Sequence, residues 1–209
     1  MTLSATLRGG KQLNFFGIFD GHNGFHMSQF LAKHLVPFVV HFLEHLYYQS
    51  QADFTKPAID GPSELAVHKA IQDGFLALDK AVVEAPLERV FSSPSKAAAV
   101  QALREAMAGS CALLAVHDND TGDVRIALTG DSRAVLGRRK RNFFGSVTYD
   151  VHVLTADHNG NNPAEVTRLN AEHPGEVLFE KSRFVGWGPS RFVLSALYSF
   201  DNFILVSFS

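Results

Sequence analysis

Residues 15–24 read FFGIFDGHNG, and they place an uncharged run directly before a polar, glycine-rich segment. The run from Phe15 to Phe19 predicts a short buried strand that ends at Asp20. After Gly24, apolar residues recur with the spacing of one buried helix face. A carboxylate between these two elements is held at the rim of the core, so the segment is a candidate metal and phosphate site.

The residues of this segment suit that chemistry. Mg2+ and Mn2+ take oxygen ligands, which the Asp20 carboxylate and the adjacent Gly21 carbonyl can supply. Gly21 has no side chain that would block an approaching ion. His22 can donate a proton to a leaving group or orient a water molecule. These residues alone leave open an ordinary strand-to-helix turn, in which Asp and Gly serve only the turn geometry.

Four further segments follow in a fixed order: GSCA at 109–112, TGDSR at 129–133, LTADHN at 154–159 and EVTR at 165–168. With DGHNG at 20–24, they resemble the metal-dependent (PPM, type 2C) Ser/Thr protein phosphatases. That family carries a DGHxG segment, a GSTA strand start, a GDSR turn and a TxDH segment, followed by a helix with an ExxR pattern. The resemblance extends from about residue 14 to 206. The residues from Asp157 onward most resemble the pyruvate dehydrogenase phosphatase branch of the family.

The resemblance implies an α+β fold, a partial four-layer α-β-β-α sandwich of two mostly antiparallel sheets flanked by helices. Residues 1–209 would form a single, incomplete domain of this type. The cofactor would be Mg2+ or Mn2+, two ions per site in the complete family fold, and the substrate a phosphoprotein. Asp20 would bridge the ions, Gly21 would add its carbonyl, and His22 would be the general acid. Asp131 would lie at the rim, where the family holds a further, weaker metal or water-mediated contacts.

Other positions of the family pattern would have a structural role in this chain or have no counterpart in it. Asp157 and His158 would be structural and tie a loop to the core. The family's Arg-x-x-x-Glu-Asp element has no counterpart, since Arg8 is the only arginine before the first predicted strand and its context differs. The run from Phe203 leads toward a second Asp-Gly metal segment, but the sequence ends at Ser209.

With Asp20 as the one firm side-chain ligand, we expect phosphatase ancestry with severely reduced or absent activity. The alternative is an inactive pseudophosphatase that binds a phosphoprotein or a regulatory partner.

The amino-acid composition narrows the classes of function and partner that remain. The 209 residues carry a net charge of −2, which gives no reason to expect binding to nucleic acid or to a membrane. The basic run Arg138–Arg141 predicts an exposed loop, with recognition of a phosphorylated or acidic partner as the alternative. The single cysteine, Cys111, excludes an internal disulfide and predicts a packed core thiol. We expect an intracellular protein, cytoplasmic or mitochondrial, and the sequence does not set its oligomeric state.

Periodicity and turn residues outline the remaining elements. Pro37 predicts a kink or restart in the first helix, and Ser63 predicts the N-cap of a second helix. Polar residues predict a loop over 49–62. The predicted helices span 27–42, 63–82 and 162–172, with helical turns within 86–108, and the further strands span 110–117, 123–128, 133–137, 151–154, 192–197 and 203–208.

Overall fold

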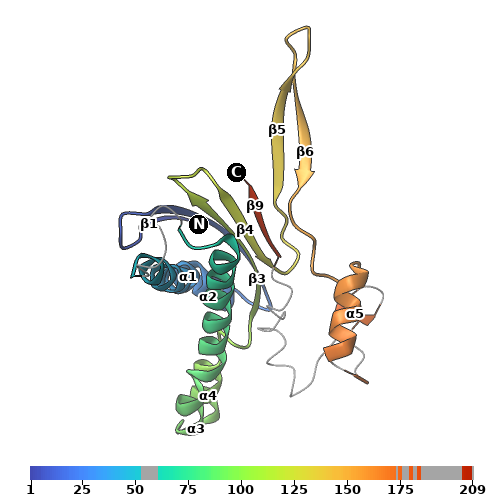
Figure 1. Ribbon diagram of the computed structural model, residues 1–209. Coiled ribbons are helices and arrows are strands. Elements are labelled where there is room, and N and C mark those ends of the chain that lie inside the picture. The colour runs from blue at the N-terminus through green and yellow to red at the C-terminus, as the bar shows by residue number, and fades with distance from the viewer. Residues whose placement is uncertain (53–60, 173, 176–178, 181–182, 185–203, 209) are drawn as a thin grey trace.

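The computed structural model describes residues 1–52, 61–172, 174–175, 179–180, 183–184 and 204–208 (Figure 1). Its centre is an antiparallel five-stranded sheet in the order β1-β2-β3-β4-β9. These strands span Thr2–Thr6, Gln12–His22, Gly109–Asp118, Val124–Thr129 and Ile204–Phe208. The long helices α1 (His26–Ala52) and α2 (Glu64–Glu84) pack on each other, and α1 also contacts β2 and β3. This arrangement confirms the predicted α+β class.

The smaller elements lie around this unit. Helices α3 (Leu87–Phe91) and α4 (Lys96–Ala102) follow α2. Strands β5 (Val135–Arg141) and β6 (Val147–Val153) form a separate hairpin that projects away from the body in Figure 1. Helix α5 (Pro163–Glu172) comes next, and β7 (Phe179–Glu180) pairs with β8 (Arg183–Phe184). Among the described residues, none of the helices combines the length and the apolar character of a membrane-spanning segment.

The main core lies between the two long helices and one face of the sheet. Alternate strand residues point into it, among them the fully buried Phe15 and Leu114. The predicted face of α2 is buried as expected, at Val67, Ile71, Phe75, Leu78 and Val82. Ser63 caps this helix, since its hydroxyl accepts a hydrogen bond from the Ala66 amide at 3.3 Å. Burial of this apolar surface is the main source of stability in the fold.

The opposite face of the sheet is only partly covered. Phe16 and Ile18 are 48% and 61% exposed, so the run predicted as a buried strand is buried on one side only. Period-2 alternation explains the difference, because neighbouring side chains of a strand point to opposite faces. A small cluster of Leu113, Ile126 and Leu128 lies on this face, with Ala134 and Leu154 packed against it.

Local structure departs from the sequence pattern in α1 and β5. Helix α1 continues through Pro37 without a restart and extends to Ala52, into the predicted loop, because a long buried face offsets the missing hydrogen bond. The basic run Arg138–Arg141 lies in strand β5, so the predicted loop is wrong. The prediction for 203–208 corresponds to β9, and the one for 192–197 falls outside the described residues.

Candidate active site

Strand register brings the first candidate residues to one end of the sheet. In the β2–β3 pairing, Asp20 lies opposite Cys111 and His22 lies opposite Gly109. Strand β4 runs next to β3 with Thr129 opposite Ala112, so Gly130 and Asp131 emerge beside Cys111. Asp20 and His22 share the strand parity of Phe16 and Ile18. The site therefore lies on the face of the sheet that turns away from α1 and α2.

The turn after β2 fixes the position of His22. Asn23 and Gly24 adopt the left-handed conformation, with φ of 57° and 114°, and the Asn23 side chain donates to the Met107 carbonyl at 2.8 Å. The His22 ring lies over Gly109, where an added Cβ would come within 2.0 Å of the ring Nε2. The absence of a side chain at Gly109 is thus what makes room for the imidazole.

Gly130 has a similar role beside Cys111. Its φ is +97°, and a Cβ at this position would lie 2.4 Å from the Cys111 sulfur. Cys111 in turn donates a hydrogen bond to the Asp131 carboxylate, with 3.3 Å between Sγ and Oδ1. This contact links the end of β4 to the middle strand of the sheet.

The segment from Thr155 to His158 is hydrogen-bonded to residues 130–134, next to this corner of the sheet. The Arg133 guanidinium donates two hydrogen bonds to the Asp157 carboxylate, and the Ala134 amide donates to the Thr155 hydroxyl at 3.0 Å. The His158 amide donates to the Gly130 carbonyl at 3.0 Å. These contacts agree with the structural role predicted for Asp157 and His158.

These segments enclose one cavity of about 260 Å³. Its lining comes from four separate stretches of the chain: Asp20, His22, Cys111, Gly130, Asp131, His158 and Asn159. The cavity therefore joins the two predicted acidic residues and the predicted proton donor. It also contains groups for which the sequence suggested no direct place in the site, namely Cys111, Asn159 and the His158 ring.

The environment sets the ionisation of two of these groups. Burial raises the pKa of the Cys111 thiol to about 11, so the thiol stays protonated and is a poor nucleophile. Cys111 is only half-buried at the cavity, so the prediction of a packed core thiol is wrong, because the strand register places it beside Asp20. Burial lowers the pKa of the His158 imidazole, so this ring is neutral at physiological pH. Its Nε2 has no hydrogen-bond partner in the described part of the chain.

The direction of the Gly21 carbonyl follows from the hydrogen-bonding pattern of β2. The Gly17 amide and carbonyl both hydrogen-bond to Met1, on the side of β2 away from β3. Because backbone groups alternate in direction along a strand, the Gly21 carbonyl points to this same side. It is not engaged by the β3 ladder and can accept a ligand.

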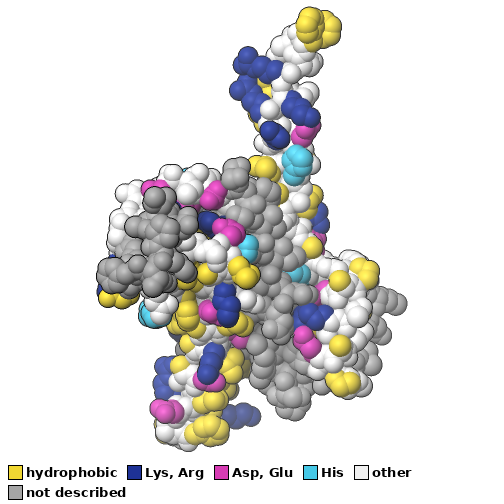
Figure 2. Space-filling model, in the orientation of Figure 1, with side chains coloured by type: hydrophobic (Ala, Val, Ile, Leu, Met, Phe, Trp, Pro, Cys, Tyr) yellow, Lys and Arg dark blue, Asp and Glu magenta, His cyan; other side chains and the backbone are white. Residues whose placement is uncertain are grey.

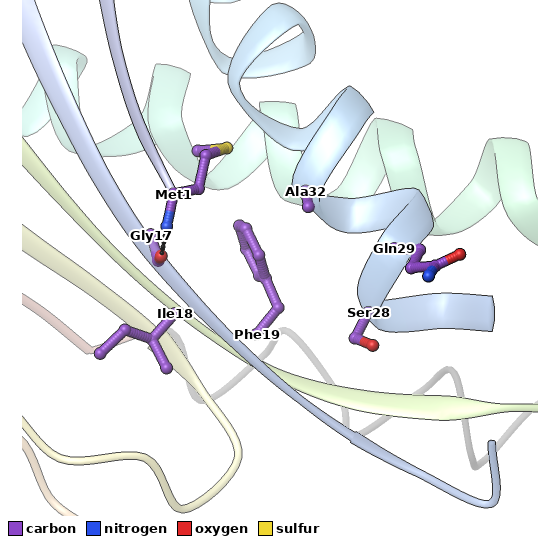
Figure 3. A pocket seen from close by; sticks show the side chains of 7 residues that line it. All are labelled: Met1, Gly17, Ile18, Phe19, Ser28, Gln29 and Ala32. Atoms are coloured by element: carbon purple, nitrogen blue, oxygen red, sulfur yellow. Dashed lines mark hydrogen bonds between the residues drawn. The ribbon is translucent and has the colours of Figure 1, made fainter. Parts of the chain in front are cut away.

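A second cavity, of about 380 Å³, lies on the helix side of β2 (Figure 3). It is lined by Met1, Gly17, Ile18, Phe19, Ser28, Gln29 and Ala32, and the Met1 ammonium donates to the Gly17 carbonyl at 2.8 Å. Figure 3 shows Phe19 between β2 and the first turns of α1. Among the described residues, no carboxylate lines this cavity, so they offer it none of the acidic ligands that a hard cation prefers.

The donor set of the first cavity suits a hard divalent cation in kind but not in number. Asp20 and Asp131 are oxygen donors of the type that Mg2+ and Mn2+ prefer. Within the described ranges, no group of three or more His, Cys, Asp or Glu side chains is arranged to hold a metal. Asp20 and Asp131 line this cavity, whereas Gly21 is not among its lining residues, so the described side chains bring two carboxylates to it.

Comparison with known proteins gives a consistent picture. A family model described as protein phosphatase 2C matches residues 2–191. A protein phosphatase 2C homolog of Schizosaccharomyces pombe is 39% identical over 193 residues, which cover 90% of this chain and 41% of the relative. The mitochondrial [pyruvate dehydrogenase [acetyl-transferring]]-phosphatase 1 of Saccharomyces cerevisiae is 37% identical over 84% of this chain and 29% of its own length.

A solved structure agrees in fold. The serine-threonine phosphatase 2C of Toxoplasma gondii superposes with a TM-score of 0.51 and 22% identity, over 76% of this chain and 44% of its own. The present chain thus spans less than half the length of these relatives.

Proposed function

The chain belongs to the protein phosphatase 2C family, and on this premise we propose that it hydrolyses phosphoserine and phosphothreonine in proteins with the help of Mg2+ or Mn2+. One observation carries the proposal. Asp20 and His22 of β2 and Asp131, which is more than 100 residues away in the sequence, line one cavity at the end of the sheet. Acidic oxygen donors beside an imidazole are the groups that this hydrolysis needs.

Asp20, Gly21 and Asp131 are the proposed ligands. A bound Mg2+ or Mn2+ would supply an activated water and would offset the charge on the phosphoryl oxygens. The chain's own contribution is to hold two carboxylates in place, Asp20 on a central strand and Asp131 through the Cys111 hydrogen bond. Two ions sharing one cavity would need more carboxylates than the described residues bring to it, because the repulsion between the ions must be offset.

His22 is the proposed general acid. The leaving oxygen of a serine or threonine needs a proton, and an imidazole within hydrogen-bond reach can supply it. The close packing of the ring over Gly109 restricts the directions in which it can donate. His158, which is neutral and strapped to Gly130, would shape the cavity wall without carrying charge.

We further propose that this chain by itself is a weak phosphatase. The described residues bring two carboxylates to the cavity and form no cluster of three or more ligands. An incomplete coordination sphere binds a divalent ion loosely, so activity would require high Mn2+ concentrations.

The test is hydrolysis of a phosphothreonine peptide with Mn2+. We expect slow turnover that the Asp20→Asn variant abolishes and that Asp73→Asn leaves unchanged, since Asp73 lies on α2 and pairs with Lys69. The His22→Ala variant should lower turnover by about 100-fold or more, as expected for loss of a general acid. Turnover that persists in Asp20→Asn would contradict the proposal.

The alternative function is that of a pseudophosphatase which binds a phosphoprotein without hydrolysing it. The missing third ligand among the described residues favours it. A phosphopeptide that binds equally well with and without Mn2+, and that is never hydrolysed, would decide for this alternative.

The relatives suggest which substrate and compartment to test first. Because the Saccharomyces cerevisiae relative is named as a mitochondrial pyruvate dehydrogenase phosphatase, phosphorylated pyruvate dehydrogenase is the first protein substrate to assay. A mitochondrial location is part of the same proposal. Fractionation of cells that express the protein tests it, and recovery in the cytosolic fraction alone would contradict it.

A further inference from the structure

The β5–β6 hairpin stands apart from the rest of the molecule. It leaves the sheet just after Asp131, projects away from the body and returns just before His158 (Figure 1). At about 3.3 Å per residue, its seven paired positions extend it by roughly 20 Å. Most of its side chains are exposed on both faces. The described residues therefore leave most side chains of this hairpin available to contact another surface.

The apex of the hairpin presents two aromatic rings to solvent. Phe143 is 99% exposed and Phe144 is 88% exposed. Their ring centroids lie 5.8 Å apart, and the two rings meet edge to face. Hydrogen bonds fix the turn beneath them. The Asn142 side chain accepts hydrogen bonds from the Phe144 and Ser146 amides, and the Asn142 carbonyl accepts one from Gly145. The turn therefore holds the two rings outward.

Positive charge is concentrated directly below these rings. Strand β5 carries four consecutive basic residues, Arg138, Arg139, Lys140 and Arg141, whereas Asp150 is the one acidic residue in β5 and β6. Lys140 forms an ion pair with Asp150, which leaves a local excess of three positive charges. Figure 2 shows this basic cluster below the apolar apex. The chain as a whole has a net charge of −2, because acidic residues elsewhere outweigh this local positive charge.

We propose that the tip of this hairpin binds to the surface of an anionic lipid bilayer. The two phenylalanines would enter the interface between headgroups and acyl chains, and the basic residues of β5 would lie at the level of the lipid phosphates. A narrow, convex apex fits a flat bilayer. A protein partner needs a broad, complementary surface of about 1,000 Å² or more, which two side chains at a tip do not provide.

Sedimentation with lipid vesicles tests the proposal. The full chain is mixed with vesicles of phosphatidylcholine alone or with about 30 mol% phosphatidylserine. We expect binding to the anionic vesicles that decreases as salt is added, and little binding to the neutral ones. This assay does not depend on phosphatase activity, so the proposal can fail or succeed separately from the proposed function.

Matched variants assign the effect to the hairpin. The double variant Phe143→Ser/Phe144→Ser should weaken binding at least about tenfold, because apolar area is no longer buried. Phe91→Ser is its control, since Phe91 is 85% exposed on α3. The double variant Arg139→Gln/Arg141→Gln should also weaken binding by about tenfold or more. Arg89→Gln on α3 is its control.

Two results would overturn the proposal. One is equal binding of the wild type and the phenylalanine variant, with unchanged thermal unfolding of both. The other is equally strong binding to soluble poly-glutamate that ignores the phenylalanine substitutions, which would point instead to an acidic protein partner.

Discussion

The two faces of the five-stranded sheet differ in what they do. The face covered by α1 and α2 carries the large core, with Phe15, Leu114 and Phe75 among its fully buried side chains. The other face carries a small cluster around Leu128, the exposed Phe16 and Ile18, and the cavity with Asp20 and His22. Side chains alternate between the two faces along one strand, so the core residue Phe15 and the candidate site residue Asp20 lie on the same strand but on opposite faces.

The largest effect should come from adjacent residues of β2. Phe15→Ala leaves a cavity in the main core and should lower the free energy of unfolding by about 3–5 kcal/mol. Phe16→Ala removes a ring that is 48% exposed and should cost about 1 kcal/mol or less. Urea denaturation of both variants measures the difference. Equal losses would mean that both faces of the sheet are equally well packed, and the division between them would not hold.

A close contact inside the core should give the next largest effect. An added Cβ at Gly74 would lie 2.8 Å from the Val39 backbone Cα, which cannot move aside cheaply. Gly74→Ala should therefore destabilise the protein by about 2 kcal/mol, although alanine is the better helix former by about 1 kcal/mol. Thermal unfolding provides the measurement, and a stabilised variant would show that α1 and α2 pack less closely than this contact implies.

The pH dependence of stability should report on Asp79 of α2. Burial raises the pKa of its carboxyl to about 7. Because the folded state holds this proton more tightly than the unfolded state, Asp79 lowers stability as pH rises from about 4 through 7. Partial exposure limits the effect to about 1–2 kcal/mol. Asp79→Asn should remove it, so unfolding of the two proteins is compared at pH 5 and pH 8. An identical difference in stability at both pH values would exclude the raised pKa.

The smallest effect on stability should come from the site face. At Gly109 an alanine meets the ring of His22, an exposed side chain at the edge of the sheet rather than a part of the core. Gly109→Ala should change the free energy of unfolding by less than about 0.5 kcal/mol while it displaces the ring. The NMR resonances of the His22 imidazole should therefore shift. Unshifted resonances would show that the ring does not lie over Gly109.

The sequence was sufficient for much of this fold. Apolar periodicity located the buried face of α2, and turn residues separated β3 from β4. What it could not provide was the pairing register, because Cys111 meets Asp20 only through long-range strand pairing. Tertiary packing also overrode local signals, as when α1 continued through Pro37 to Ala52.

The same division applies to the candidate site. Its acidic residues and His22 lie in short motifs with recognisable chemistry, so they could be named from the sequence. The His158 ring and Asn159 enter the cavity only because residues 154–158 are strapped to 130–134. A basic run gives no signal that distinguishes a loop from a strand, which is why β5 was missed at Arg138–Arg141.

The most direct test of the central claim is Mn2+ affinity by calorimetry in four proteins: the wild type, Asp20→Asn, Asp131→Asn and the double variant. If both carboxylates hold one ion, each single substitution should weaken binding at least about tenfold, and the double variant should be little worse than either. Asp73→Asn, on the helix face, should bind as the wild type does. Unchanged Mn2+ affinity in Asp20→Asn would contradict the claim that this face of the sheet is a metal site.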